Sequence, residues 1–185
     1  MNKFNFDKRK NNMLLESLID HQPKTVAVDF DNTCVYDEWP EVGEDLWGAE
    51  EVLQKLVENN CKIILLTQRE HNTPYGDLLS PAINWFKERN IPLYGINENP
   101  YQKDGLEGRK IYASVYIDDH CLGIATTEDE NSKGKVINTV YWPAVDRWLV
   151  QHGYYDEPAL ELKDDDLSYI HEAIKSTGIN KLVIK

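Results

Sequence analysis

The chain has 185 residues, of which 41% are hydrophobic and 28% are charged, and its formal net charge is −12 at pH 7. This length is that of one ordinary domain, which can bury a core without disulfides. The negative charge argues against nucleic acid as a partner, because a polyanion would meet a repulsive mean field.

Three cysteines, Cys34, Cys61 and Cys121, are scattered along the chain and form no metal-binding spacing. An odd, dispersed set of this kind favours a reducing compartment. The polar, basic first residues lack the apolar stretch of a signal peptide, and no apolar run is long enough to span a bilayer. We therefore expect a cytoplasmic protein without a membrane partner.

Hydrophobic patterns predict alternating strands and helices in the first two thirds of the chain. A run of β-branched residues predicts a strand at 25–30, and apolar residues at helical spacing predict a helix over 49–60. A continuous apolar run predicts a strand at 62–66 that is covered on both faces. The other elements expected in this part are a helix over 78–90 and strands at 91–96 and 110–117.

The last third of the chain is expected to hold a hairpin, one long helix and a terminal segment. Pro143 suits the start of the helix, which would run to residue 152. The other elements expected here are a short strand at 122–125, a polar turn at 126–135, a returning strand at 136–141, a helix over 165–175 and an edge strand at 182–184.

This order of elements predicts an α/β fold with right-handed crossovers, namely a doubly wound, Rossmann-like, mostly parallel sheet with helices on both faces. We expect an N-terminal extension at 1–24, one main domain at 25–156 and a C-terminal segment at 157–185. Within the domain, the polar, aromatic-rich stretch at 34–48 has the length of a hairpin-like flap.

Two carboxylates end the first predicted strand. Val28 and Phe30 share one side of this strand, so Asp29 and Asp31 fall together on the other side. They would lie at the carboxyl end, where parallel sheets bind ligands. A divalent cation such as Mg²⁺ relieves the repulsion between two crowded carboxylates. Considered alone, the pair also fits a solvated acidic turn, but the residues downstream argue against that interpretation.

Further polar residues are expected at the same rim of the sheet: Thr67, Lys110 and the pair Asp118 and Asp119. Together these groups supply what phosphoryl transfer needs. One carboxylate can attack phosphorus and carry it as an acyl phosphate, while a second acid protonates the leaving oxygen and then activates water. A hard cation, a hydroxyl and an ammonium stabilise the remaining phosphate oxygens.

The whole set resembles the four motifs of the haloacid dehalogenase superfamily of phosphohydrolases: DxDxT at 29–33, Leu65-Leu66-Thr67, Lys110, and Ile117-Asp118-Asp119. The resemblance spans roughly residues 24–125, and four motifs in this order are highly specific. It implies a Mg²⁺-dependent phosphomonoester hydrolase that acts through an aspartyl-phosphate intermediate.

The resemblance also implies a role for each matched residue. Asp29 would be the nucleophile and Asp31 the general acid and base. Thr67 and Lys110 would bind the phosphate, and the hydroxyl of Thr33 would support the loop.

The implied Mg²⁺ ligands are Asp29, the backbone carbonyl of Asp31, Asp118 directly, and Asp119 through water. The superfamily usually has Gly at the position of Asn32, and Asn tolerates the left-handed conformation that this turn requires.

The spacing of the motifs leaves room for a flap at 34–48 and a loop at 97–109, so the chain resembles the small capless subgroup with its open sites. Tyr36 and Trp39 in the flap are candidate substrate contacts. Arg69 is another, although a surface ion pair with a neighbour such as Glu70 would suit it equally.

Two alternatives stay open for the function. The pattern Thr67-x-Arg69 resembles the second motif of the 3′-phosphatase domain of phage polynucleotide kinase, which would make the protein a polynucleotide 3′-phosphatase-like enzyme, although the charge of −12 weighs against it. The chain could also be a catalytically silent binding protein. An open site suits either a bulky or macromolecular phosphoester or a homo-oligomer in which a neighbouring subunit completes the pocket.

Overall fold

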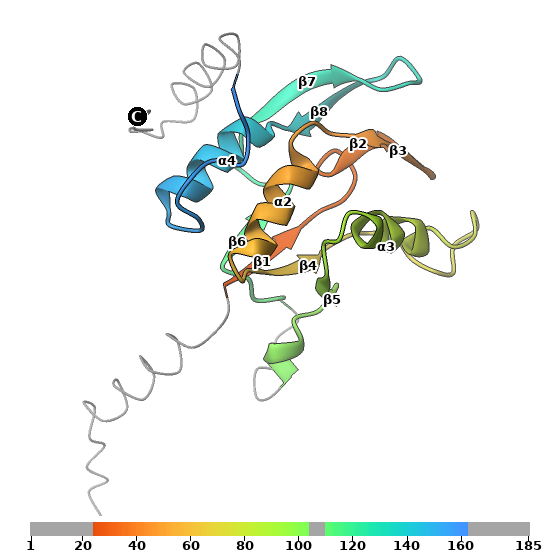
Figure 1. Cartoon of the computed structure of the whole chain (residues 1–185). Coiled ribbons are helices and arrows are strands. Elements are labelled where there is room, and N and C mark those ends of the chain that lie inside the picture. The colour runs from red at the N-terminus through yellow and green to blue at the C-terminus, as the bar shows by residue number, and fades with distance from the viewer. Residues whose placement is uncertain (1–23, 104–109, 163–185) are drawn as a thin grey trace, which may run out of the picture.

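The structure, a computed structural model, describes residues 24–103 and 110–162 (Figure 1). The expected N-terminal extension, the helix at 165–175 and the edge strand at 182–184 lie outside the described residues, except for Lys24. Within the described ranges, no helix combines the length and the apolar character needed to cross a membrane.

Four parallel strands form the central sheet in the order β5-β4-β1-β6. Their bounds are Thr25–Val28 for β1, Lys62–Leu65 for β4, Leu93–Ile96 for β5 and Val115–Ile117 for β6. Val28 pairs with both Leu65 and Ile117, so the three adjacent strands β4, β1 and β6 end level at one rim. All four strands were predicted, although the last begins at Val115 rather than at residue 110.

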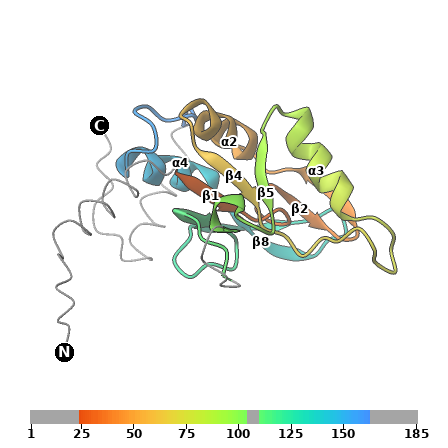
Figure 2. The same cartoon turned by 90° about the horizontal axis from the view of Figure 1, so that it is seen from below.

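Within the described residues, three α-helices pack on one face of this sheet (Figure 2). They are α2 (Ala49–Glu58), α3 (Leu79–Glu88) and α4 (Trp142–Gln151). Their apolar stripes meet the strand residues of one parity, and Val26, Val28, Ile63 and Leu65 belong to this main core. The protein is therefore a mixed α/β protein with a parallel sheet, as the element order predicted.

The opposite face of the sheet has a thinner cover. Ala27 and Ile64 face this side and form a small cluster with Ala113. The described part of the connection from β5 to β6 contains the short 3-10 helix η1 (Pro100–Lys103) rather than an α-helix. Within the described residues, the expectation of α-helices on both faces is therefore not met.

Two antiparallel hairpins complete the fold. The predicted flap is the hairpin of β2 (Val35–Glu38) and β3 (Glu41–Asp45), and the second hairpin joins β7 (Thr126–Glu130) to β8 (Val136–Val140). The predictions at 122–125 and 126–135 were wrong, because the strand lies at 126–130 and only the residues after it form the turn. The sequence of β7 is polar and has no apolar pattern that predicts a strand. The strand forms through its antiparallel pairing with β8.

Candidate functional site

The carboxyl ends of β1, β4 and β6 open into one cavity of about 690 Å³. The N–H of Asp29 donates to Ile117 O at 2.9 Å, and the N–H of Leu66 donates to Val28 O at 2.8 Å, so these ends stay level. The cavity lining combines strand-end residues with residues of the flap and the loop after β4: Asp29, Asp31, Asn32, Asp37, Trp39, Leu66, Thr67, Gln68, Thr73, Asp118 and His120. Four of the residues predicted from the motifs are thus brought together: Asp29, Asp31, Thr67 and Asp118.

Asp29 is partly buried and directly follows β1. Burial raises its pKa to about 7, and a backbone hydrogen bond with Phe30 only partly offsets this effect. The nearby carboxylates of Asp118, Asp119 and Asp31 raise the pKa further. Burial and these like charges therefore favour the neutral form of Asp29.

Asp31 forms a two-point ion pair with Arg69. The guanidinium donates from Nε to Oδ2 at 2.9 Å and from Nη2 to Oδ1 at 2.7 Å. Arg69 is completely buried, and its guanidinium carbon lies 5.3 Å from the ring centroids of both Phe30 and Trp39. Arg69 is therefore not a surface residue paired with its neighbour, and it does not line the cavity. Its guanidinium instead fixes the position of the Asp31 carboxylate.

The turn after Asp31 is held by buried hydrogen bonds. Asn32 has a φ of 57°, which is the left-handed conformation expected for this position. The buried hydroxyl of Thr33 accepts the N–H of Asp119 at 3.3 Å, and the indole Nε1 of Trp142 donates to Thr33 O at 2.6 Å. The predicted support role of Thr33 therefore has a geometric basis, which includes a tryptophan from α4.

Asn97 holds Thr67 by its main chain, a contact that the sequence analysis missed. The Thr67 N–H donates to Asn97 Oδ1 at 2.8 Å, and Asn97 Nδ2 donates to Thr67 O at 2.8 Å. The Thr67 hydroxyl also accepts the N–H of Arg69 at 3.1 Å. Asn97 follows β5 with a φ of 50°. An Asn directly after a strand was the available signal, because Asn adopts this conformation more readily than most residues.

Asp118, Asp119 and His120 could together hold a metal ion, because one ligand atom from each lies within 4.8 Å of the others. Burial raises the pKa of Asp119, whose Oδ1 lies 3.0 Å from His120 Nδ1. The hydrogen bond with Asp119 in turn raises the pKa of His120, although this side chain is 86% exposed. The carboxylates of Asp118 and Asp119 suit a hard cation.

Four predicted site residues are not among the described residues that line the cavity: Tyr36, Arg69, Lys110 and Asp119. Lys110 is exposed, and its Nζ lies 5.9 Å from the ring centroid of Tyr116. Tyr36 packs against the main core, whereas Trp39 lines the cavity. Among the described lining residues there is no lysine or arginine, so these residues provide no fixed cation for a bound phosphate.

No protein-family model matches the chain, and no curated protein matches it. Among solved structures, the chain is similar to a conserved protein coded by a locus from Bacteroides thetaiotaomicron. The two sequences are 36% identical, the match covers 55% of this chain and 80% of that one, and the TM-score is 0.48.

Proposed function

We propose that this protein is a Mg²⁺-dependent phosphomonoester hydrolase that acts through an aspartyl phosphate on Asp29. One observation carries the proposal: polar residues that follow three adjacent parallel strands line a single cavity, namely Asp29, Asp31, Thr67 and Asp118. Parallel sheets bind ligands at the carboxyl ends of their strands. Three acids and a hydroxyl around one cavity match the needs of phosphoryl transfer.

In the first step, a carboxylate oxygen of Asp29 attacks the phosphorus of the bound ester, and the bond from phosphorus to the leaving oxygen breaks. Asp31, which must enter this step protonated, donates its proton to that oxygen, which departs as an alcohol. In the second step, Asp31 takes a proton from water while the water oxygen attacks the aspartyl phosphate. Inorganic phosphate leaves, and both acids return to their starting protonation states.

The donor set fits Mg²⁺. Asp29, Asp118 and Asp119 offer carboxylate oxygens, which Mg²⁺ prefers, whereas structural and catalytic zinc sites are rich in nitrogen and sulfur. The raised pKa of Asp29, caused first by burial and then by the neighbouring carboxylates, indicates that a cation would be favourable here. When bound, the ion would supply positive charge that offsets these acids and the phosphate oxygens.

The finer details of the proposed fold and site also rest on the motif resemblance. We propose that the sheet is a capless, doubly wound fold of the haloacid dehalogenase type, which the central position of β1 and the short β2–β3 flap support. Phosphate binding is assigned to Thr67 and the metal ion. Lys110 is left out of the described site because its ammonium lies by Tyr116.

A screen of phosphate monoesters with Mg²⁺, repeated with Asp29→Asn, tests the proposal. We expect Asp29→Asn to abolish turnover while the protein stays folded, and mass spectrometry of wild-type protein quenched during turnover to detect phosphate on Asp29. Asp156→Asn, a substitution of an exposed carboxylate that does not line the cavity, is the matched control and should retain the phosphoenzyme. Full turnover by Asp29→Asn would rule out the covalent mechanism, and inactivity on every ester would favour the silent binding protein.

The polynucleotide 3′-phosphatase alternative is less well supported. Its motif resemblance depended on Arg69, which is buried under Asp31 rather than exposed to an approaching strand. The described lining residues offer no lysine or arginine to a nucleic-acid backbone. Including an oligonucleotide with a 3′-phosphate in the screen tests this alternative directly.

A further inference from the structure

Trp39, at the turn between β2 and β3, is the only Trp, Tyr or Phe among the described residues that line the cavity. The buried guanidinium of Arg69 covers part of the indole, with 5.3 Å between its carbon and the ring centroid. Nevertheless, 39% of Trp39 remains exposed. Trp39 is therefore a partly exposed aromatic residue in the lining of the cavity.

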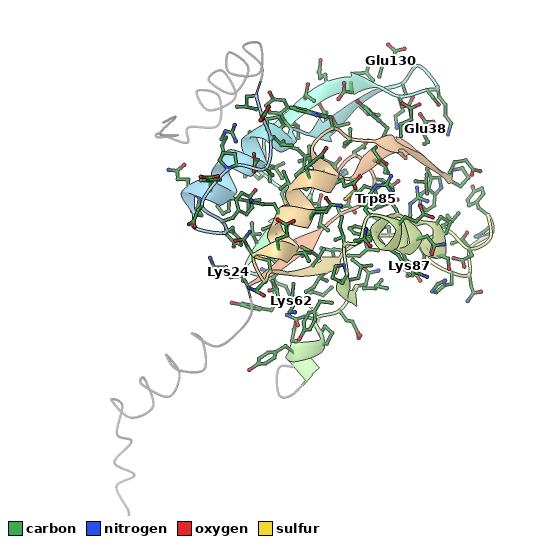
Figure 3. All side chains as sticks on the ribbon, in the orientation of Figure 1. Lys24, Glu38, Lys62, Trp85, Lys87 and Glu130 are labelled. Carbon is green, nitrogen blue, oxygen red and sulfur yellow. The ribbon has the colours of Figure 1, made fainter. Side chains whose placement is uncertain are left out.

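The main chain around Trp39 is fixed from two sides. Lys133, in the turn between β7 and β8, donates from Nζ to the carbonyl oxygens of Glu38 and Trp39, at 2.8 and 3.0 Å. Arg69 donates to the next two carbonyl oxygens, those of Pro40 and Glu41, at 3.1 and 2.7 Å. Figure 3 shows Glu38 on the β2–β3 hairpin, beside the turn between β7 and β8. An aromatic surface that is held in place beforehand loses little freedom when a ligand binds.

An exposed indole at the wall of a cavity binds flat rings best. Every nucleobase has a π-face that stacks on an aromatic side chain. Polar groups of Asp37, Gln68 and Thr73 also line the cavity and can bind sugar hydroxyls or the edge of a base. A volume of about 690 Å³ lies within the range of small-molecule sites.

We propose that the cavity takes a nucleoside monophosphate, with the base stacked on Trp39 and the phosphate at Asp29. This inference rests on the proposed function and assigns its substrate class. Additional phosphates would meet the carboxylates of Asp31 and Asp37, no lysine or arginine among the described lining residues, and the net charge of −12. A single phosphate on a single nucleoside fits these charges better than a triphosphate or an oligonucleotide does.

The test compares kcat/KM for adenosine 5′-monophosphate with kcat/KM for ribose 5-phosphate, which carries a hydroxyl in place of the base. We expect wild-type protein to prefer the nucleotide. Trp39→Ala should lower the ratio of the two values by about 5- to 150-fold, the range that stacking of one base supplies. Trp39→Phe, which keeps a ring, should retain most of the preference. Trp47→Ala is the matched control, because Trp47 is 51% exposed but does not line the cavity.

A binding measurement separates this inference from the proposed reaction. In Asp29→Asn, adenosine 5′-monophosphate should quench tryptophan fluorescence, and the quenching should be lost when Trp39→Phe is added. A wild-type ratio near one, or unchanged quenching in that double variant, would overturn the inference while leaving the hydrolase proposal intact. A preference for an oligonucleotide with a terminal phosphate over the mononucleotide would overturn it as well. If no ester is hydrolysed but the quenching follows Trp39, the proposed reaction fails and the nucleotide site stands.

Discussion

Arg69 and Asp31 are joined by two hydrogen bonds at 2.9 and 2.7 Å, with the arginine completely buried. The same guanidinium donates to the carbonyl oxygens of Pro40 and Glu41 in the flap. One side chain therefore sets both the orientation of the proposed acid and the position of the hairpin above it. The Asp31 carboxylate and the β2–β3 hairpin are therefore coupled, and a movement of one disturbs the other.

Substitution of Arg69 should affect stability and catalysis in separable ways. Arg69→Met leaves the Asp31 carboxylate without its partner and should lower the free energy of unfolding by about 3–5 kcal/mol. Arg69→Lys keeps the charge but loses the two-point geometry. In this variant we expect proton donation to be misaligned, so turnover of an alkyl phosphate should fall by about 100-fold.

The readout that isolates this positioning role is the dependence on the leaving group. An aryl phosphate with an activated leaving group needs no proton, so Arg69→Lys should slow its hydrolysis far less. Equal losses for both substrates would indicate that Arg69 acts only through folding.

Mg²⁺ should stabilise the protein as well as activate it. Asp118 lines the same cavity as Asp29, and a hard cation bound there would favour the ionised form of Asp29, whose pKa burial raises to about 7. EDTA should abolish activity, and saturating Mg²⁺ should restore it and raise the free energy of unfolding by about 2.7 kcal/mol at one hundred times its Kd. Asp118→Asn should remove most of the rise in melting temperature, whereas Thr67→Ala should keep it. Better activation by zinc than by Mg²⁺ would contradict the ligand set.

Lys133 should influence substrate binding from outside the cavity. Its ammonium holds the carbonyl oxygens of Glu38 and Trp39. Lys133→Met frees this turn, so we expect KM for nucleoside monophosphates to rise several-fold while kcat changes little. Lys135→Met is the control, because its Nζ is 4.0 Å from Asp37 Oδ2 and it contacts the flap only weakly. A fall in kcat with an unchanged KM would contradict the role of Lys133.

Asp77 should make stability depend on pH at the start of α3. Its Oδ1 accepts the N–H groups of Leu79 and Ser80 at 3.1 and 2.9 Å, and the hydrogen bonds with Ser80 lower its pKa from 3.8 to about 2. The unfolded chain then binds more protons between these two values, so the stabilisation is complete above pH 4 and is lost as pH falls toward 2. Asp77→Ala should lower the urea midpoint at pH 7, and its difference from wild type should shrink below pH 4.

Asp77→Asn removes the negative charge but keeps a side-chain oxygen that can accept the N–H groups of Leu79 and Ser80 at the start of α3. Asn is also a good capping residue, so this variant should keep most of the midpoint at pH 7. A gap between wild type and Asp77→Ala that stays constant from pH 7 to pH 3 would show that the carboxylate has no linkage to folding.

Asp146 should be essential to the stability of the segment after α4. This buried carboxylate accepts the Tyr155 hydroxyl at 2.7 Å and the N–H groups of Ala159 and Leu160 at 3.0 and 3.1 Å. Asp146→Ala leaves these donors without a partner, and we expect a loss of about 3–5 kcal/mol in denaturant unfolding. The exposed Asp156→Ala is the control. Addition of Tyr155→Phe should cost less in the Asp146→Ala background than in wild type, because the two residues share one hydrogen bond.

Local patterns were sufficient to predict the central sheet. The apolar runs that became β1 and β4 and the helical spacing in α2 are each set by residues close in sequence. The left-handed turn at Asn32 was also predictable, because it follows from the residue type. These elements could be predicted without knowing which residues pack against them.

Contacts between distant segments were not predictable in the same way. Arg69 has an acidic neighbour in Glu70, yet its partner Asp31 lies 38 residues earlier in the chain. Asn97 binds Thr67 across 30 residues, and β7 is polar enough to be taken for a turn until β8 pairs with it. In each case the partner that determines the structure is supplied by the fold rather than by the local sequence.

The turn of the β7–β8 hairpin holds the flap in place, and this has a consequence for folding during synthesis on the ribosome. Asp29, Thr67 and Asp118, with the strands that they follow, emerge before residue 131, where the turn that holds the flap begins. Asn131 and Lys133 donate to the carbonyl oxygens of Asp37, Glu38 and Trp39. Because folding during translation proceeds from the N-terminus, the sheet can form while the cavity wall that includes Trp39 is still unfinished. A nascent chain released before this turn would have its proposed nucleophile but an incomplete binding surface.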